Sequence, residues 1–355
     1  MSDRPTIRDV AQHAGVSIAT VSRVLNDKDD VSAQTRERVR AAATHLGYKV
    51  DSAARALVSQ QTRLVAVVVG DNSGHRDLSL IFFGKVLAAI SRRLAQSGYE
   101  PLLLQAVDGQ SDVSPLDVSF GHRFDAAIVI GVDDDDPLIV GLAARQIPLV
   151  GVDVRSGGAR TAFVGSDHDE GVRLAIAHLH ALGHRRIAHI AGGANTVAGA
   201  DRLDAFRRAV ERFGLELPDA YVRSGDFSSA SGYRETCALL ALANPPTAIV
   251  AASDLMALAA LQAIWESGLR PAHDVAVVGF DDLEAAALAH PPLTTIRQDR
   301  QALGTLAATC AIELIEHADA PARTTVLPVE LVVRASSAAT RPQSASGAAS
   351  FEGSR

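Results

Sequence analysis

Cysteine, methionine and aromatic residues are scarce in this sequence, and long apolar runs are missing. Its 355 residues include two cysteines, Cys237 and Cys310, which lie far apart and without the spacing of a metal site. One disulfide is formally possible, but two distant thiols are more simply understood as reduced, in a reducing compartment. No apolar run approaches the ~18–20 residues that a membrane-spanning helix needs. Residues 1–5 carry no apolar segment typical of a secretion signal, so we expect a cytoplasmic protein without membrane contact.

Motifs of catalysis and cofactor binding are also missing. The sequence contains no nucleophile elbow and no P-loop, and Gly192 and Gly193 lack the spacing of a dinucleotide site. The histidine cluster at residues 178–184 is interrupted by Gly183 and shows no complete set of metal ligands. The acidic run at residues 133–136 fits a solvated loop better than a cation site. We therefore expect no enzyme, no cofactor and no metal site.

Charge is distributed unevenly along the chain. The formal net charge of −7 disfavours a protein that does nothing but bind nucleic acid. Residues 1–62, however, contain nine basic and seven acidic side chains, so this part is mildly basic and the remainder carries the acidic excess. Such a distribution lets the N-terminal part approach phosphate while the rest of the chain stays away from it.

Three short amphipathic helices are predicted at the N-terminus, with a tight turn between the first two. Thr6 and Asp9 are spaced as a capping pair for the first helix, and Gly15 follows it where a left-handed residue would end it. Ser17 and Ser32 are placed to begin the second and third helices. Apolar residues recur at helical spacing in each segment. This arrangement is typical of a helix-turn-helix.

The second of these helices has an outward face with the chemistry for reading DNA. Arg23 can donate two hydrogen bonds to a guanine, and Ile18 and Ala19 offer apolar contact to a thymine methyl group. Short polar side chains around them suit phosphate contacts. The predicted DNA-binding residues of this part are Thr6, Ser17, Ile18, Ala19, Thr20, Ser22, Arg23 and Asn26. A small helical bundle with a polar outer face is the alternative that these residues alone leave open.

Beyond residue 62, apolar strands alternate with helical segments. The expected strands are residues 64–69, 102–104, 126–130, 149–152, 187–190, 248–251 and 275–278. Strands this apolar, each followed by a helical or loop stretch, predict parallel sheets covered on both faces. Two such units in series predict an α/β fold of two doubly wound lobes, with ligands bound beyond the C-terminal ends of the strands.

Long stretches of the sequence closely resemble the lactose/galactose repressor family of transcriptional regulators. They include TIRDVAQHAGVSIATVSRVLN at Thr6, LHALGHRRIAHIAGG at Leu179, VAVVGFDDLE at Val275 and PPLTTIRQD at Pro291. The resemblance implies a helix-turn-helix headpiece, a hinge helix and two lobes of periplasmic-binding-protein type. It also implies a repressor that binds a pseudo-palindromic DNA operator as a homodimer and responds to a small-molecule effector, a carbohydrate in the first instance. A nucleoside or purine effector, a sugar-acid effector and, in a different class, a solute-binding protein are the alternatives.

The resemblance sets the expected domain boundaries. The parts are a headpiece (1–49), a hinge (50–61), a body (62–338) with a first lobe (about 62–161 and 292–324) and a second lobe (about 162–290 and 325–338), and a disordered tail (339–355). The chain is expected to cross between the lobes near Thr161, His290 and Thr325. The tail has no heptad repeat, so we expect a dimer rather than a tetramer held by a C-terminal coiled coil.

The expected hinge is rich in alanine but too short to be a stable helix alone in water. The resemblance implies that it becomes helical on DNA and that Ala54 and Leu57 contact the minor groove, where Leu57 kinks the duplex. A plain linker with Leu57 against the body is the alternative. Val50, Asp51 and Val58 differ from the residues common in the family, which leaves the capping and groove contacts of this helix open.

Several residues of the body match positions where the family contacts its effector. Carboxylates accept hydrogen bonds from hydroxyl groups, a guanidinium donates two in a fixed geometry, and an aromatic ring stacks on a CH face. The expected effector-binding residues are Asp153, Ala198, Arg202, Phe227, Ser253, Asp281 and Gln298.

Each of these assignments has a structural alternative. Asp153 and Asp281 could cap helices, Phe227 could belong to the core, and Arg202 could pair with either carboxylate for structure alone. Arg300 replaces an aromatic residue found in some sugar-binding members, which is consistent with a charged or differently shaped effector.

Overall fold

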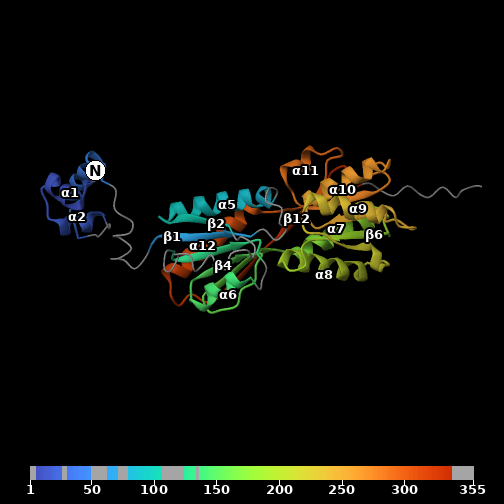
Figure 1. Ribbon diagram of the computed structural model, residues 1–355, viewed down its shortest axis with the longest axis horizontal. Helices are drawn as coiled ribbons and strands as arrows, with labels where there is room; N and C mark the ends of the chain where they lie inside the picture. Colours follow the sequence, from blue (N-terminus) through green and yellow to red (C-terminus); the bar gives the residue numbers. More distant parts are fainter. Residues whose placement is uncertain are drawn as a thin grey trace, which may run out of the picture. The chain divides into compact units, whose positions relative to one another are not determined.

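Two structural units, residues 1–63 and 64–355, make up the chain in the computed structural model (Figure 1). The structure describes residues 5–25, 30–48, 62–70, 79–105, 124–132 and 136–337. The expected hinge and tail lie outside these ranges, as do Asn26, Ala54 and Leu57. No helix of the described part is long and apolar enough to cross a membrane.

The first unit contains the three predicted helices, α1 (Ile7–Ala14), α2 (Ile18–Leu25) and α3 (Ala33–His45). The Asp9 carboxylate accepts hydrogen bonds from the backbone N–H and the hydroxyl of Thr6, at 2.6 and 2.7 Å. Gly15 ends α1 in the left-handed conformation, with φ 62°. One small core joins the helices, and it consists of Val10, Ala11, Ala14, Val21, Val24, Val39, Ala42 and Ala43. The predicted helix-turn-helix is therefore confirmed.

A six-stranded, fully parallel sheet forms the first lobe of the second unit, in the order β11-β5-β4-β3-β1-β2. Its strands are β1 (Leu64–Val69), β2 (Glu100–Gln105), β3 (Ala126–Ile130), β4 (Leu149–Val152), β5 (Thr161–Ser166) and β11 (Arg323–Leu327). Along β1, Val65 and Val67 face one hydrophobic core, while Ala66 and Val68 face another. The sheet is thus buried on both faces, as an unbroken apolar strand predicts.

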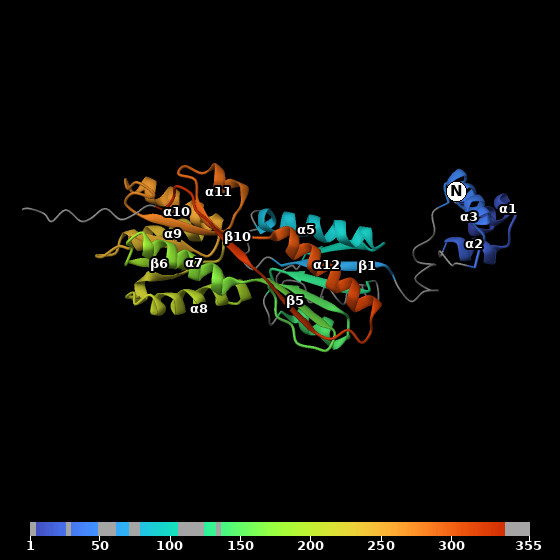
Figure 2. The ribbon, with the colours of Figure 1, turned by 180° about the vertical axis from the view of Figure 1, so that it is seen from behind.

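Helices cover both faces of this sheet. On one face lie α5 (Ser79–Gln96) and α12 (Arg300–Glu316), which pack side by side (Figures 1 and 2). A Cβ atom at Gly304 of α12 would lie 2.3 Å from the Val86 carbonyl oxygen, so only glycine permits this close approach of the two helices. The other face is covered by α6 (Pro137–Ala144).

The second lobe has a six-stranded sheet in the order β12-β10-β9-β8-β6-β7, parallel except for β12. Its strands are β6 (Ile187–Ala191), β7 (Val222–Ser224), β8 (Ala248–Ala251), β9 (Ala276–Asp281), β10 (Thr294–Gln298) and β12 (Val329–Val332). One core joins it to α7 (His168–Ala181) and α8 (Val197–Arg212). A second core lies on the other face, with α9 (Ser229–Leu240), α10 (Asp254–Glu266), α11 (Glu284–Leu288) and the 3-10 turn η1 (Asp219–Tyr221).

The chain crosses between the lobes at places that differ from the expected ones. β5 pairs with β4 and β11 in the first sheet, so the first crossing follows Ser166 and does not lie near Thr161. β10 pairs with β9 in the second sheet while α12 packs on the first, so the second crossing lies at Asp299 and not near His290. The third lies between β11 and β12, close to the expected Thr325. The first two crossings both come later in the sequence than expected, because β5 and β10 pair along their whole length before the chain leaves the sheet.

Candidate effector site and DNA-binding face

A cavity of about 420 Å³ lies where the strands of both lobes end. The first lobe contributes residues that follow β3 and β4, and the second contributes residues at the ends of β8 and β9 and at the start of α8. Its volume falls within the range of small-molecule sites, and its position agrees with the rule that doubly wound sheets bind ligands beyond the strand ends. Its lining includes Phe82, Phe83, Val132, Asp153, Thr196, Ala198, Arg202, Asp226, Phe227, Ser253, Leu255 and Asp281.

Arg202, on α8, contributes a cation to this lining and is only 3% exposed. Its Nη1 donates to the carbonyl of Ala252 and lies 3.9 Å from Asp281 Oδ1. Its guanidinium carbon lies 3.8 Å from the centroid of the Phe280 ring. Burial lowers the pKa of Arg202, while Asp281 and Asp153 act in the opposite direction. The charge is thus held by an aromatic face and two carboxylates, at the wall of a cavity where a ligand can reach it.

Asp153 follows β4 and faces Arg202 from the other lobe. Its Oδ1 accepts from the backbone N–H of Ser166 at 3.3 Å and contacts His168 Nε2 at 3.1 Å. Burial by itself raises the pKa of this carboxyl, but His168 and Arg202 outweigh it and hold the pKa below its ordinary value. Asp153 is therefore an ionised acceptor at neutral pH, which suits a hydroxyl donor on a ligand.

Asp281 closes β9 and is 6% exposed. Gln298 Nε2 donates to its Oδ1 at 2.7 Å. Burial raises the pKa of Asp281 to about 6, although Arg202 and Gln298 pull it down. Asp254 lies in the same buried region, and burial together with Asp281 raises its pKa well above the ordinary value.

The Asp281→Asn variant is expected to gain stability relative to the natural chain as the pH rises from about 4 to above 6. The pKa of Asp281 lies near 6 in the folded protein. Between about pH 4 and pH 6, its carboxyl group is therefore still protonated in the folded protein but already ionised in the unfolded chain. The natural chain therefore loses stability across this window, by about 3 kcal/mol at most. Urea unfolding of both proteins across the window measures the difference. A difference that stays constant with pH would contradict the raised pKa.

Aromatic rings form the apolar part of the lining. Phe227 comes from the loop before α9, and Phe82 and Phe83 come from α5 of the other lobe, where the two rings meet edge to face at 5.3 Å. Phe227 packs on the second core and also lines the cavity, so it belongs to the core, and its contact with a ligand stays a prediction. Phe227, Asp153 and Asp281 have φ values of 67°, 49° and 124°. Such left-handed backbone is strained in non-glycine residues and clusters at functional sites.

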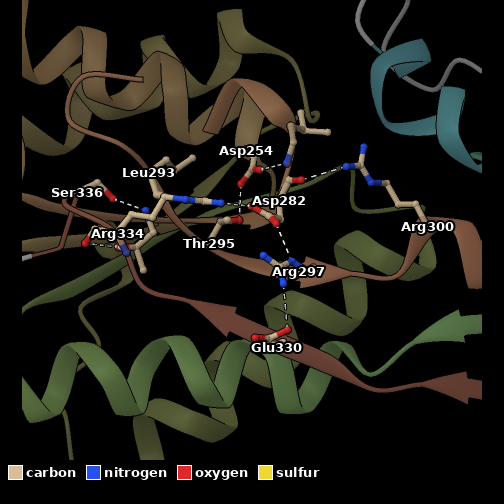
Figure 3. Close-up of polar contacts among 11 residues, drawn as sticks. Asp254, Asp282, Leu293, Thr295, Arg297, Arg300, Glu330, Arg334 and Ser336 are labelled. Atoms are coloured by element: carbon tan, nitrogen blue, oxygen red, sulfur yellow. Dashed lines mark hydrogen bonds and ion pairs between the residues drawn. The ribbon is translucent and has the colours of Figure 1, made fainter. Parts of the chain in front are cut away.

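Behind the cavity, Asp282 connects Arg297 of β10, Arg300 at the start of α12 and Arg334 beyond β12 (Figure 3). Its carboxylate accepts from Arg334 Nη2 at 2.6 Å and from Arg297 Nε at 2.7 Å. Its carbonyl accepts from Arg300 Nη2 at 3.0 Å. Burial raises the pKa of Asp282, but Arg297 and Arg334 outweigh it and the pKa is lowered. Because Asp281 and Leu283 line the cavity on either side of Asp282, this cluster joins the cavity to the crossing segments.

Comparison with known proteins identifies the family of the chain. The model described as "Bacterial regulatory proteins, lacI family" matches residues 6–51, and the "Periplasmic binding protein-like domain" model matches residues 176–337. The HTH-type transcriptional regulator CelR of Thermobifida fusca is 36% identical over 335 residues, which cover 94% of this chain and 98% of CelR. The chain belongs to the LacI family. The resemblance seen in the sequence is confirmed.

Other known regulators are similar to this LacI-family protein over almost its whole length. The lactose operon repressor of Escherichia coli K12 is 36% identical over 347 residues, or 96% of this chain and 93% of that repressor. The crystal structure of the lac repressor dimer bound to operator and an anti-inducer matches with a TM-score of 0.81 and 34% identity, over 95% of this chain and all of that one. The CelR–cellobiose complex matches with a TM-score of 0.70 and 34% identity, over 94% and 100%. These relatives are transcriptional regulators, so the expectation that the protein is not an enzyme holds.

Most of the expected effector residues lie together in this LacI-family structure. Asp153, Ala198, Arg202, Phe227, Ser253 and Asp281 all line the cavity. Gln298 is absent from the lining and lies behind Asp281, whose carboxylate it binds. The capping alternative for Asp153 and Asp281 is wrong, because Asp167 and Leu283 occupy the N-caps of α7 and α11. Ser253, by contrast, has a structural role as well, since its hydroxyl accepts from the backbone N–H of Met256.

Other lining residues were not predicted from the sequence. Phe82 and Phe83 form the one pair of adjacent aromatic residues in a chain poor in them, and this signal could have identified them. Thr196 caps α8 and Asp226 binds the N–H of Ser228, so both resemble ordinary turn residues in sequence. His168 has no sequence signal beyond its place at the start of a helix.

The helix-turn-helix leaves α2 open toward solvent. Ser17, Ile18, Ala19 and Arg23 are exposed, and Thr20 and Ser22 are half-buried. The Ser17 hydroxyl accepts from the backbone N–H of Thr20 at 3.1 Å. Thr6, at the start of α1, is also exposed. The predicted DNA-binding residues that the structure describes are thus accessible.

The described residues contain no group of three or more His, Cys, Asp and Glu side chains placed to hold a metal ion. The histidines noted in the sequence have separate partners. His178 contacts Ser337, His184 contacts Thr247, and the ring of His180 lies 5.1 Å from that of Phe213. Cys237 and Cys310 are both free thiols.

Proposed function

We propose that this chain is a transcriptional repressor that binds a pseudo-palindromic operator as a homodimer and releases or binds it in response to a neutral, carbohydrate-like effector. The observation that supports the effector most directly is the cavity itself. It combines Arg202 with the carboxylates of Asp153 and Asp281 and with the rings of Phe82 and Phe227. A polyhydroxylated ligand with an apolar face satisfies both kinds of wall.

The charges of the lining favour a neutral effector over an anionic one. Among the residues that the structure describes, Asp153, Asp226 and Asp281 line the cavity together with one arginine, Arg202. Arg300, which in sequence is consistent with a charged effector, does not line the cavity. Its guanidinium binds the Asp282 carbonyl and lies 6.0 Å from the Phe82 ring. An anionic group would therefore meet more carboxylates than cations.

The relatives support this proposal without fixing the effector. A CelR structure is a complex with cellobiose, and a lac repressor structure is bound to ONPG in the repressed state. The PurR repressor of Escherichia coli O139:H28 is 33% identical over 304 residues. A nucleoside or purine effector, the alternative left open by the sequence, is the second candidate. The aromatic rings of the lining suit a base as well as a sugar.

A ligand panel distinguishes these candidates. Thermal shift of the purified full chain is measured with cellobiose, lactose, glucuronate, gluconate, guanine and adenosine. We expect a neutral disaccharide to raise Tm by mass action and the sugar acids to have no effect. A shift with guanine or adenosine alone would replace the carbohydrate proposal by a purine one, and a shift with a sugar acid alone would contradict the charge argument.

DNA binding is proposed for the headpiece, in the cytoplasm where the DNA lies. The exposed α2 enters the major groove, while the hinge with Ala54 and Leu57 contacts the minor groove. Effector binding would change the spacing of the two hinges in the dimer, with a coupling energy of about 1–3 kcal/mol. The relative bound to operator is a dimer in its crystal structure, which supports the same assembly here.

The Arg23→Ala variant is expected to lose base discrimination while keeping general DNA affinity. Arg23 pairs with Asp30 at 3.4 Å, but both side chains are 58% exposed, so this pair costs little to break. A bidentate contact to guanine contributes about 1–3 kcal/mol of discrimination. Selection of bound sequences from a random DNA pool measures the preference at each position.

Arg38→Ala is the matched control, because Arg38 is an exposed arginine of α3 outside the proposed reading face. It removes the same charge and should weaken binding to all sequences alike. An Arg23→Ala profile identical to that of the natural chain would exclude a base-reading role for Arg23.

A further inference from the structure

His168 connects two residues of the effector cavity without lining the cavity itself. It is the first residue of α7, directly after the first crossing between the lobes, and is 4% exposed. One ring nitrogen, Nε2, lies 3.1 Å from Asp153 Oδ1, and the other, Nδ1, accepts from Arg202 Nε at 3.3 Å. Asp153 belongs to the first lobe and Arg202 to the second, so the imidazole bridges the two lobes.

The partners determine which nitrogen of His168 carries the proton. An arginine Nε–H can only donate, so Nδ1 must be the unprotonated acceptor. Asp153 is ionised and can only accept, so Nε2 must carry the proton and donate to it. A neutral imidazole with its proton on Nε2 satisfies both partners at once. A doubly protonated ring would set its Nδ1–H against the Nε–H of Arg202.

The surroundings hold the ring in this orientation. The Phe280 ring packs against the imidazole, with centroids 5.8 Å apart, and Asp281 lies on the far side of Arg202. The charged groups that contact His168 are therefore Asp153 at the end of β4 and Arg202 on α8, and Asp281 at the end of β9 lies 3.9 Å from Arg202. Among the described residues, no hydrogen bond reaches Asp153 Oδ2 or Arg202 Nη2. These two atoms are left for a ligand.

We propose that His168, as the Nε2–H tautomer, is a positioning residue that orients Asp153 and Arg202 across the lobe junction for the effector. The inference rests on the proposed effector site. It assigns His168 a role that does not require contact with the ligand, because both of its ring nitrogens are already used. The Asp153 and Arg202 side chains then meet the effector in a fixed orientation, which lowers the entropy cost of binding.

The first test measures the tautomer in the full-length, ligand-free protein. Nitrogen NMR of protein labelled at histidine is compared with that of His168→Gln to identify the His168 signals. We expect one protonated nitrogen, Nε2, and one unprotonated nitrogen, Nδ1, at neutral pH. The Arg202→Lys variant should shift the Nδ1 signal, because it removes the Nε–H donor. A proton on Nδ1, a doubly protonated ring, or a Nδ1 signal that ignores Arg202→Lys would overturn the proposal.

The second test measures affinity for the sugar that the panel identifies, with cellobiose as the first probe. His168→Gln should bind it about tenfold or more weakly, because it cannot serve both partners in this geometry. His168→Asn, whose amide oxygen can replace Nδ1 toward Arg202, should recover part of that loss. His178→Gln is the matched control, since His178 lies on the same helix but contacts Ser337 away from the cavity.

The two tests separate this inference from the proposed function. If no sugar binds the natural chain, the carbohydrate proposal fails, while the tautomer measurement still decides the placement of His168. If sugar binds equally well to the natural chain, His168→Gln and His178→Gln, the positioning role is wrong and the carbohydrate proposal stands.

Discussion

The Arg202→Ala variant is expected to lose its effector response almost completely while it still binds DNA. Within the described part of the chain, Arg202 is the one lysine or arginine that lines the cavity, and its side chain is buried beside Asp281. Hydrogen bonds to a charged group contribute about 1.5–3 kcal/mol each. Loss of two such bonds to a ligand therefore costs at least about 3 kcal/mol, more than 100-fold in affinity. Isothermal calorimetry with the sugar from the panel and release of bound DNA measure the two parts of this response.

Stability must be measured alongside, because the truncation leaves two carboxylates without their buried partner. Removing one member of a buried ion pair costs about 3–5 kcal/mol. Arg202→Lys keeps the charge but not the fork geometry, so it should remain more stable than the alanine variant and still bind sugar weakly. Arg207→Ala is the matched control on the same helix, where Arg207 and Asp204 are 57% and 60% exposed. Full effector response in a folded Arg202→Ala protein would show that the effector binds elsewhere.

The sequence predicted the interior strands of the fold more successfully than the strands near the lobe junction. β1, β3, β4 and β8 have the bounds that their apolar runs predicted, because a strand buried on both faces must be apolar throughout. β5, β10 and β11 were not predicted. β10 has the sequence TTIRQ, which looks like an exposed segment because most of its residues are polar. Thr294 and Thr295 are nevertheless buried, because their hydroxyls form hydrogen bonds with other residues of the protein.

The residues of the candidate site also differ in how well the sequence predicts them. Residues at strand ends, such as Asp153 and Asp281, could be expected in one crevice, because parallel strands present their carboxyl ends on one side. His168 could not, since its partners Asp153 and Arg202 are distant in sequence and come from different lobes. Gln298 was expected to bind the effector, but it lies behind Asp281 and binds that carboxylate. The wrong boundaries near Thr161 and His290 come from this region as well. Strand pairing, rather than local sequence, decides where the chain leaves a sheet.

The Asp282→Ala variant is expected to lower the stability of the body by about 2–4 kcal/mol. The Asp282 and Arg334 side chains are 12% and 18% exposed, and their atoms lie 2.6 Å apart, so this pair is shielded from solvent. Removing the carboxylate leaves the partly buried Arg334 with the Leu293 carbonyl as its remaining partner, and Arg297 with Glu330 alone. Urea unfolding at neutral pH measures the loss, and thermal unfolding should show a Tm lower by several degrees.

Glu330→Gln is the matched control, because Glu330 binds the same Arg297 from the outside. That contact is 3.2 Å long, but the two side chains are 47% and 68% exposed, so its loss should cost less than about 1 kcal/mol. The pH dependence separates charge from packing. Because the folded pKa of Asp282 is lowered, its contribution is present above the unfolded pKa of about 4 and is lost as the pH falls through the folded pKa. The difference in free energy of unfolding between the natural chain and Asp282→Asn should therefore disappear at acid pH. A difference that persists there would mean that Asp282 stabilises the protein by its shape and not by its charge.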